Sequence, residues 1–158
     1  MKKEIVTNIA LLRKPCEPVQ DKENIKPIIQ DLKDSLDPTK GYALSSNQLG
    51  YNKRIFYVKF PKIDPKTKQI SYEEMIVINP KIVEKLAPFR FKQEGCLSLP
   101  GLKVDTLRYN FIIVECLDEH LKQQTHTLVG LRAVIFLHEY DHLNGKTIFD
   151  RKYKNTKT

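Results

Sequence analysis

The segment from His138 to His142 carries the strongest chemical signal in the sequence, because it reads His-Glu-Tyr-Asp-His. On an α-helix, residues four apart share one face, so both imidazoles can approach a single metal ion. Glu139 lies about 100° round such a helix from His138 and can reach a metal-bound water without being a ligand. This pattern is typical of metal-assisted hydrolysis with the glutamate as general base.

A helix predicted over Leu131–Leu143 must position these groups. Leu131, Val134 and Ile135 fall on the same helical face as the two histidines. That face is therefore predicted to turn toward the core, where each unpaired polar group costs about 1–3 kcal/mol. A metal ion satisfies both imidazoles at once.

A catalytic metal site of this kind needs a third protein ligand and leaves one position open for water. After His142 the only carboxylate is Asp150, which lies in a short tail and is a poor candidate. The third ligand must then come from upstream. Cys96 stands out there, because Gly95 and Pro100-Gly101 give its surroundings a sharply shaped backbone.

Composition and charge narrow the class of protein. The chain has 27 basic and 19 acidic residues, a net charge of +8, and its lysines are mostly scattered, which favours a solvated basic surface. No apolar run approaches the roughly 18–20 residues of a membrane span, and no signal peptide is expected. The other two of the three cysteines, Cys16 and Cys116, are interpreted as small buried residues in a reducing compartment.

The remaining elements predict an α+β fold in a single domain, residues 1–158. Residues 24–36 form a predicted helix, because isoleucines and leucines recur on one face. Residues 61–68 are predicted to be a hairpin loop. Strands are predicted at 54–60, 75–79, 81–86, 103–107, 111–117 and 124–128. We expect antiparallel or mixed β-sheets packed around the central metal-binding helix.

Three segments, in order, resemble the three motifs of the peptide deformylases. Gly41 to Gly50 resembles the family's Gly-x-Gly-Leu-Ala-Ala-x-Gln-x-Gly segment. The other two are Glu-Gly-Cys-Leu-Ser at Glu94–Ser98 and His-Glu-x-Asp-His-Leu at His138–Leu143. Each motif alone is a moderate signal, whereas three in order over most of the chain are specific.

The resemblance implies an activity and a metal. Peptide deformylases remove the formyl group from the N-terminal formyl-methionine of newly made peptides. Their single divalent metal ion is held by the residues matching Cys96, His138 and His142, with water as the fourth ligand. The ion expected in the cell is Fe(II), with zinc, nickel or cobalt as replacements. A thiolate ligand suits iron or zinc and not magnesium or calcium.

The same resemblance assigns roles in the reaction. The residue matching Glu139 takes the proton of the water and returns it to the leaving amine. The side-chain amide of Gln48 and the backbone N–H of Leu97 donate hydrogen bonds to the developing oxyanion. Preorganised donors beside a Lewis-acid metal are the stabilisers that a tetrahedral oxyanion requires.

Supporting and substrate-binding residues follow from the matching positions. Glu94 resembles the family's buried acid, and Arg108 is its expected partner. Asp141 is interpreted as a residue that orients a ligand, or as a surface charge. Ala43 replaces the family's second glycine, so we expect it to change substrate binding. The residues expected to contact the substrate are Tyr42, Ala43, Leu44, Glu94, Gly95, Leu131, Val134 and Ile135.

The tail after His142 is short, whereas bacterial deformylases of the usual length carry a C-terminal helix there that docks on the ribosome. The resemblance therefore predicts a short form similar to bacteriophage versions. The expected partners are N-formyl-methionine nascent peptides, with at most transient ribosome contact. We expect a monomer in the bacterial or phage-infected host cytoplasm, with no membrane partner and no specific nucleic acid.

Two alternatives remain open. A zinc peptidase of the His-Glu-x-x-His type predicts cleavage of internal peptide bonds, but it lacks a downstream third ligand here. A basic RNA- or ribosome-binding protein with a structural metal predicts four protein ligands and no open position. The sequence offers three well-placed ligands, which favours catalysis.

Overall fold

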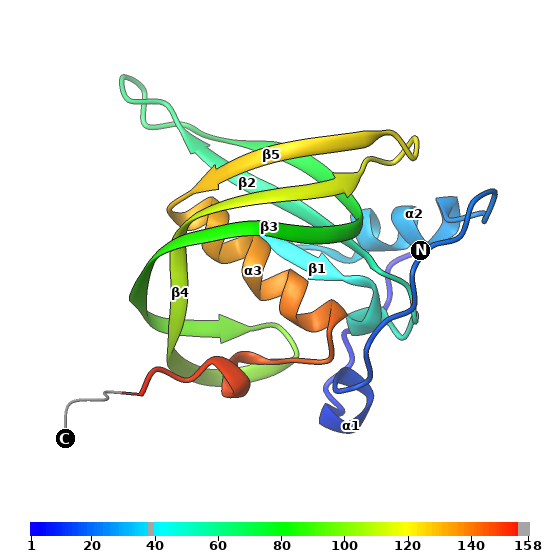
Figure 1. The fold of residues 1–158 in the computed structure, drawn as a ribbon, viewed down its shortest axis with the longest axis horizontal. Coiled ribbons are helices and arrows are strands. Elements are labelled where there is room, and N and C mark those ends of the chain that lie inside the picture. The colour runs from blue at the N-terminus through cyan, green and yellow to red at the C-terminus, as the bar shows by residue number, and fades with distance from the viewer. Residues whose placement is uncertain (38–39, 155–158) are drawn as a thin grey trace.

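The computed structural model describes residues 1–37 and 40–154, which form a five-stranded antiparallel sheet and several helices (Figure 1). The strands are β1 (Ala43–Ser45), β2 (Ile55–Ile63), β3 (Ile70–Cys96), β4 (Leu99–Leu117) and β5 (Gln123–Val129). The helices are α1 (Ile9–Leu12), α2 (Lys26–Ser35) and α3 (Leu131–Leu143), with 3-10 helices η1 (Ser46–Leu49) and η2 (Ile148–Arg151). Spatial order follows chain order, and the α+β prediction is confirmed with purely antiparallel pairing among these strands.

β3 and β4 are far longer than the predicted strands, at 27 and 19 residues, and they curve round α3 (Figure 1). The β3–β4 register shifts across Asn79-Pro80, at Val83 and again near Gln93, and Asn79 and Gln93 have φ of 49° and 54°. Such bulges bend a strand and increase its twist. The strands predicted at 75–79 and 81–86 are therefore one strand, as are those at 103–107 and 111–117.

The two faces of the sheet bury different helices. Successive side chains of a strand point to opposite faces, and β2 shows the consequence. Phe56 and Val58 belong to the core cluster that contains α3, whereas Ile55 and Tyr57 belong to the cluster beside α2. The ring of Phe56 meets Phe136 of α3 edge to face, with 5.0 Å between centroids. One face of the sheet thus packs against α3, and the other face packs against α2.

The helix boundaries agree with the prediction for α3 and differ from it for α2. α3 begins and ends where the sequence predicted, and Gly145 follows it with φ of 74°. A Cβ at Gly145 would lie 2.3 Å from the backbone oxygen of Arg13, so a close chain approach reinforces the helix stop. α2 begins at Lys26, two residues later than predicted, and Ile25 occupies its N-cap position.

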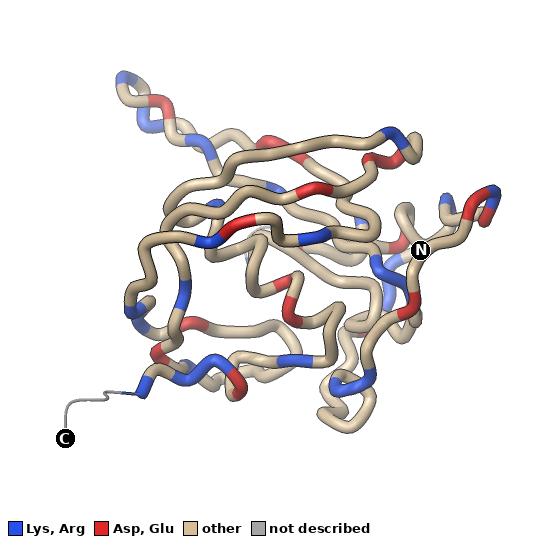
Figure 2. The backbone as a smooth tube through the Cα atoms, viewed as in Figure 1, with Lys and Arg blue, Asp and Glu red and all other residues tan. Residues whose placement is uncertain are grey.

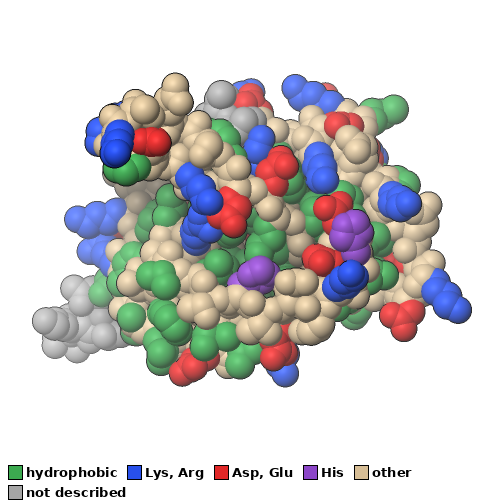
Figure 3. All heavy atoms as spheres, turned by 90° about the horizontal axis from the view of Figure 1, so that it is seen from above, with side chains coloured by type: hydrophobic (Ala, Val, Ile, Leu, Met, Phe, Trp, Pro, Cys, Tyr) green, Lys and Arg blue, Asp and Glu red, His purple; other side chains and the backbone are tan. Residues whose placement is uncertain are grey.

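The predicted hairpin at 61–68 is present, but β2 continues to Ile63 and the turn is confined to the residues between β2 and β3. Acidic and basic residues intersperse along the chain (Figure 2). On the face drawn in Figure 3 they interleave with apolar side chains, in line with the scatter read from the sequence. In the described ranges, no helix has the length and apolar character to cross a membrane.

Candidate metal centre

Three ligand atoms from distant parts of the chain meet beside α3. Cys96 Sγ lies 3.3 Å from His142 Nε2, which lies 3.2 Å from His138 Nε2, and the three candidate ligand atoms all fall within 4.8 Å of one another. Ligands of a tetrahedral zinc-type ion are about 3.3–3.6 Å apart, given metal–ligand bonds of about 2.0–2.3 Å. This donor set of one thiolate and two imidazoles therefore fits a single divalent transition-metal ion.

The elements of the fold explain why these atoms converge. His138 and His142 are one turn apart on α3, which is buried between the sheet and the far end of the β3–β4 ribbon (Figure 1). Cys96 is the last residue of β3, and it pairs with Leu99 across a turn made by Leu97 and Ser98. The bent hairpin thus brings the thiol back to the helix.

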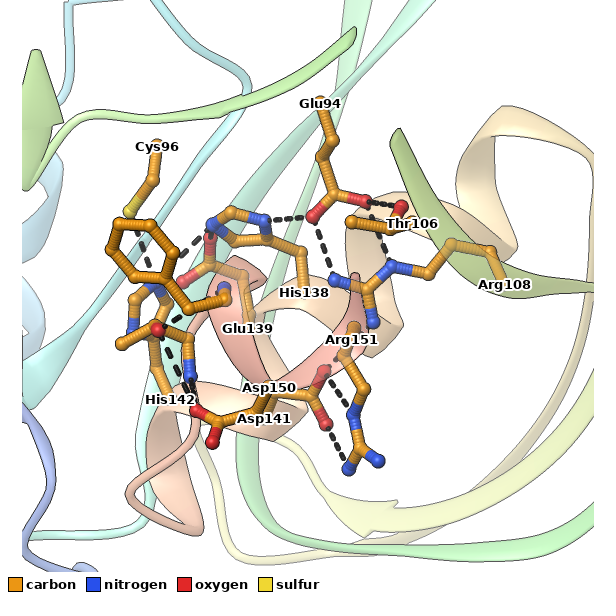
Figure 4. A network of polar contacts seen from close by, with 12 residues as sticks. Glu94, Cys96, Thr106, Arg108, His138, Glu139, Asp141, His142, Asp150 and Arg151 are labelled. Atoms are coloured by element: carbon orange, nitrogen blue, oxygen red, sulfur yellow. Dashed lines mark hydrogen bonds and ion pairs between the residues drawn. The ribbon is translucent and has the colours of Figure 1, made fainter. Parts of the chain in front are cut away.

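A buried network of charges orients His138. Its Nδ1 lies 2.6 Å from Glu94 Oε2, and Arg108 donates to both oxygens of the same carboxylate at 2.8 and 2.6 Å. Thr106 Oγ1 donates to Glu94 Oε1 at 2.8 Å. Because the carboxylate accepts, Nδ1 carries the imidazole proton and leaves Nε2 to face the other ligand atoms. Figure 4 shows the His138 ring between Glu94 and the other two candidate ligands.

The charge state of Glu94 follows from these contacts. Burial alone would raise the pKa of its carboxyl group, but hydrogen bonds from Arg108 and His138 more than offset this and hold the pKa well below its usual range. Burial lowers the pKa of His142, so that imidazole is neutral, as a metal ligand must be. The expected Glu94–Arg108 pair is present and fully buried.

Asp141 is buried in this network, so the surface-charge interpretation of it is wrong. It accepts a hydrogen bond from Arg108 Nη1 at 2.7 Å and from Arg151 Nε and Nη2 at 3.0 and 2.9 Å. Asp141 therefore joins α3 to β4 and to η2 at once. Arg151 and Thr106 were not predicted to belong to the site. Thr106 had a signal, since it lies two residues before Arg108 on the same strand face.

The short segment β1–η1 forms the opposite wall. The side-chain oxygen of Gln48 accepts from the backbone N–H of Ser45 at 3.0 Å. This contact turns the amide nitrogen toward the centre, where it lies 3.1 Å from Ser98 Oγ and 3.9 Å from Cys96 Sγ. Asn47 donates to the backbone oxygen of His142 at 2.7 Å, which fixes this wall to α3. Ser98 was not singled out from the sequence, although it closes the second motif.

Glu139 has the environment of a proton carrier. Its side chain is 3% exposed, and Oε2 has no hydrogen-bond partner among the described residues. Oε1 lies 3.9 Å from His138 Nε2, so the carboxyl group faces the three ligand atoms without belonging to them. Burial raises the pKa of Glu139 to about 7. A group with a pKa near the working pH can both accept and release a proton.

A cavity of about 600 Å³ opens beside these polar groups. Seven of the eight residues expected to contact substrate line it, namely Tyr42, Ala43, Glu94, Gly95, Leu131, Val134 and Ile135. The exception is Leu44, whose side chain is fully buried in the core cluster beside α2. Three further lining residues were not predicted from the sequence: Phe91, Gln93 and Lys103. Phe91 and Gln93 lie in a part of β3 where no strand was predicted, and Lys103 lies in β4 at the first residue of a predicted strand.

An antiparallel sheet around a metal-binding helix, with a buried carboxyl group beside an open cavity, defines a metal-dependent hydrolase. The chain belongs to the peptide deformylase family, because the family model described as "Polypeptide deformylase" matches residues 2–158. A peptide deformylase of Aquifex aeolicus is 39% identical over 145 residues, which cover 89% of this chain and 81% of that protein. Peptide deformylase 2 of Clostridium perfringens is 32% identical, with 96% and 92% covered.

Solved structures agree in fold. The crystal structure of peptide deformylase from Ehrlichia chaffeensis superposes with a TM-score of 0.85 at 28% identity, covering 98% of this chain and 89% of that one. A probable peptide deformylase from synechococcus phage S-SSM7 gives a TM-score of 0.79 at 28% identity, covering 96% and 99%. The family resemblance stated from the three motifs is thereby confirmed. That the present chain is a short form remains a prediction.

Proposed function

We propose that this protein removes the formyl group from the N-terminal formyl-methionine of newly made peptides. The observation that carries the proposal is the convergence of Cys96, His138 and His142 within 4.8 Å, beside a cavity large enough for an N-terminal residue. Membership of the deformylase family supports the choice of substrate. Water adds to the formyl carbon, the C–N bond breaks, and the products are formate and a free amino terminus.

Cys96, His138 and His142 would hold the metal ion. When bound, the ion supplies Lewis-acid activation of water and of the formyl carbonyl. We propose Fe(II) as the ion in the cell, with zinc, nickel or cobalt able to occupy the same ligands. The mixed sulfur and nitrogen donor set supports a transition-metal ion of this group, since such ligands disfavour magnesium and calcium.

Glu139 and two hydrogen-bond donors carry the other steps. Glu139 accepts the proton of the attacking water on its carboxylate and gives it to the departing amine nitrogen. The Gln48 amide, held by Ser45, and the backbone N–H of Leu97 donate to the oxygen that becomes negative. Since Gln48 is already oriented in the folded protein, it needs no reorganisation when that charge develops.

The apolar end of the cavity is the proposed site for the methionine side chain. Leu131, Val134 and Ile135 line it from α3, with Tyr42 and Ala43 on the facing wall. An unbranched thioether side chain adapts well to an irregular apolar pocket. The Leu44 side chain is buried elsewhere, so any contact from Leu44 to substrate would come from its backbone.

A comparison of two peptides tests the function. Metal-loaded protein, purified without oxygen, is incubated with formyl-Met-Ala-Ser or with the matched acetyl-Met-Ala-Ser, and free amine and formate are measured. We expect rapid release from the formyl peptide and much slower release from the acetyl peptide. Fragments from internal cleavage would instead support the zinc-peptidase alternative. No product from metal-bound protein would contradict the proposal.

The setting of the reaction is proposed on similar grounds. We infer that residues 1–158 act as one catalytic domain and as a monomer in the cytoplasm, where nascent peptides are made. All three cysteines are free thiols, which supports a reducing compartment. Light scattering after size exclusion should give the mass of one chain, about 18.4 kDa, and a doubled mass would contradict the monomer.

A further inference from the structure

Two lysines stand at the mouth of the cavity. Lys40 and Lys103 line the same cavity as His138 and Glu139, and both are exposed. Within residues 1–37 and 40–154, neither lysine has an ion-pair partner within 4.0 Å. Their ammonium groups therefore face solvent and whatever enters the cavity.

The acidic residues that line the cavity do not offset this charge. They are Glu94 and Glu139, and both are buried at its floor. Glu94 is already paired with Arg108 and His138. The charge that an entering peptide meets first is therefore positive, although the floor of the site is not.

The ammonium group of Lys103 lies close to the candidate metal centre. A Cβ built on Gly95 would lie 2.5 Å from Lys103 Nζ, so this ammonium group covers the residue next to Cys96. An extended peptide advances about 3.3–3.6 Å per residue. With its formyl carbon at the metal centre, a substrate must therefore carry its second and third residues past the cavity mouth.

A second groove, of about 450 Å³, continues from the cavity and shares Ile5, Lys40 and Leu97 with it. Its other charged lining residues are Lys2, Lys3, Glu4 and Asp37. Basic side chains thus outnumber acidic ones along this path too. The second groove carries both acidic and basic side chains. The lysines at the cavity mouth should therefore discriminate most clearly between peptides of different charge.

We propose that Lys40 and Lys103 determine specificity for the peptide beyond its first residue, so that formyl-methionine peptides with Asp or Glu at positions two and three are preferred. This inference rests on the proposed deformylase function. Each lysine attracts an acidic side chain in a solvent-exposed setting, where one ion pair changes affinity by up to about fivefold. Two such contacts, and the steering of an anionic peptide to the mouth, act in the same direction.

The test compares three peptides that differ only in charge: formyl-Met-Glu-Glu-Ser, formyl-Met-Gln-Gln-Ser and formyl-Met-Lys-Lys-Ser. For metal-loaded protein at low ionic strength, we expect kcat/KM to fall in that order, with the glutamate peptide about fivefold or more above the glutamine peptide. Added salt should shrink the ratio, since exposed charges are screened. In the double variant Lys40→Gln/Lys103→Gln the ratio should approach one.

A matched double variant distinguishes the local effect of the two cavity lysines from the effect of lowering the net charge of the protein. Lys66→Gln/Lys68→Gln removes the same charge from the β2–β3 turn, outside the cavity lining, and should keep the wild-type ratio. A ratio near one in wild type, or an equal fall in both double variants, would overturn the inference and leave the deformylase function standing. If no peptide is deformylated, the function fails, and Kd values from fluorescence anisotropy with labelled peptides still decide. Equal Kd values for the three peptides would overturn the charge preference.

Discussion

The two halves of α3 contribute to the site in different ways. In the C-terminal half, His138 and Asp141 are fixed by hydrogen bonds of 2.6–3.0 Å from partners on β3, β4 and η2. In the N-terminal half, Val134 and Ile135 offer only apolar surface to the cavity. Hydrogen bonds orient the candidate ligands in the C-terminal half, whereas the N-terminal half forms part of the apolar cavity wall. Substitutions should therefore separate into effects on metal and stability and effects on substrate.

The largest effect is expected at a ligand in the polar half. His142→Ala should lower metal affinity by more than about 100-fold, because loss of a partner outside the ligand set already costs about 10–100-fold. Metal content after dialysis against a calibrated chelator measures this, and circular dichroism checks the fold. The control is His120→Ala in the exposed β4–β5 turn, which should retain metal. Full metal content in the His142→Ala variant would show that His142 is not a metal ligand.

The network behind the candidate ligands should affect the stability of the fold. Arg108→Met removes the positive charge that pairs with the buried carboxylates of Glu94 and Asp141. This loss should lower the free energy of unfolding by about 3–5 kcal/mol. The matched control is Arg90→Met, whose pair with Asp105 is largely exposed and should change stability by at most about 1 kcal/mol. Urea unfolding compares the two variants, and equal losses would contradict the role assigned to burial.

The smallest effect should come from the apolar half. Val134→Ala removes two methyl groups from the proposed methionine pocket and should lower kcat/KM for formyl-Met-Ala-Ser by about tenfold. Its metal content should remain that of the unsubstituted protein. The ratio of activities on formyl-methionine and formyl-alanine peptides should fall with it. If the variant lost metal instead, the proposed division of α3 into a metal-binding half and a substrate-binding half would be wrong.

Local patterns predicted α3 and the placement of its two histidines well, since a four-residue spacing places two side chains on one helical face wherever the helix lies. The long strands were harder to predict. Pro80 separated two of the predicted strands, yet it lies within β3, because bulges and pairing with β4 carry the strand past it. Pairing between segments this far apart is a tertiary effect, so no local pattern reports it.

Local patterns and tertiary contacts also differ in how well they predicted the residues of the site. Cys96 could be found because glycine and proline around it mark a shaped backbone, and Gln48 because its segment resembles a family motif. The contact of Arg151 with Asp141 joins η2 to α3, and the cavity lining from Phe91 and Lys103 depends on the curvature of β3 and β4. These contacts arise from how elements pack, which spacing along the chain does not encode.

The most direct test of the central claim is the variant Glu139→Gln, with metal content and turnover of formyl-Met-Ala-Ser measured on the same sample. We expect the variant to keep one metal ion per chain and to lose about 10²–10⁴-fold in kcat, because the amide cannot accept and return the proton. Loss of the metal would mean that Glu139 is a ligand. Undiminished turnover with metal bound would mean that another group moves the proton, and either result would contradict the account.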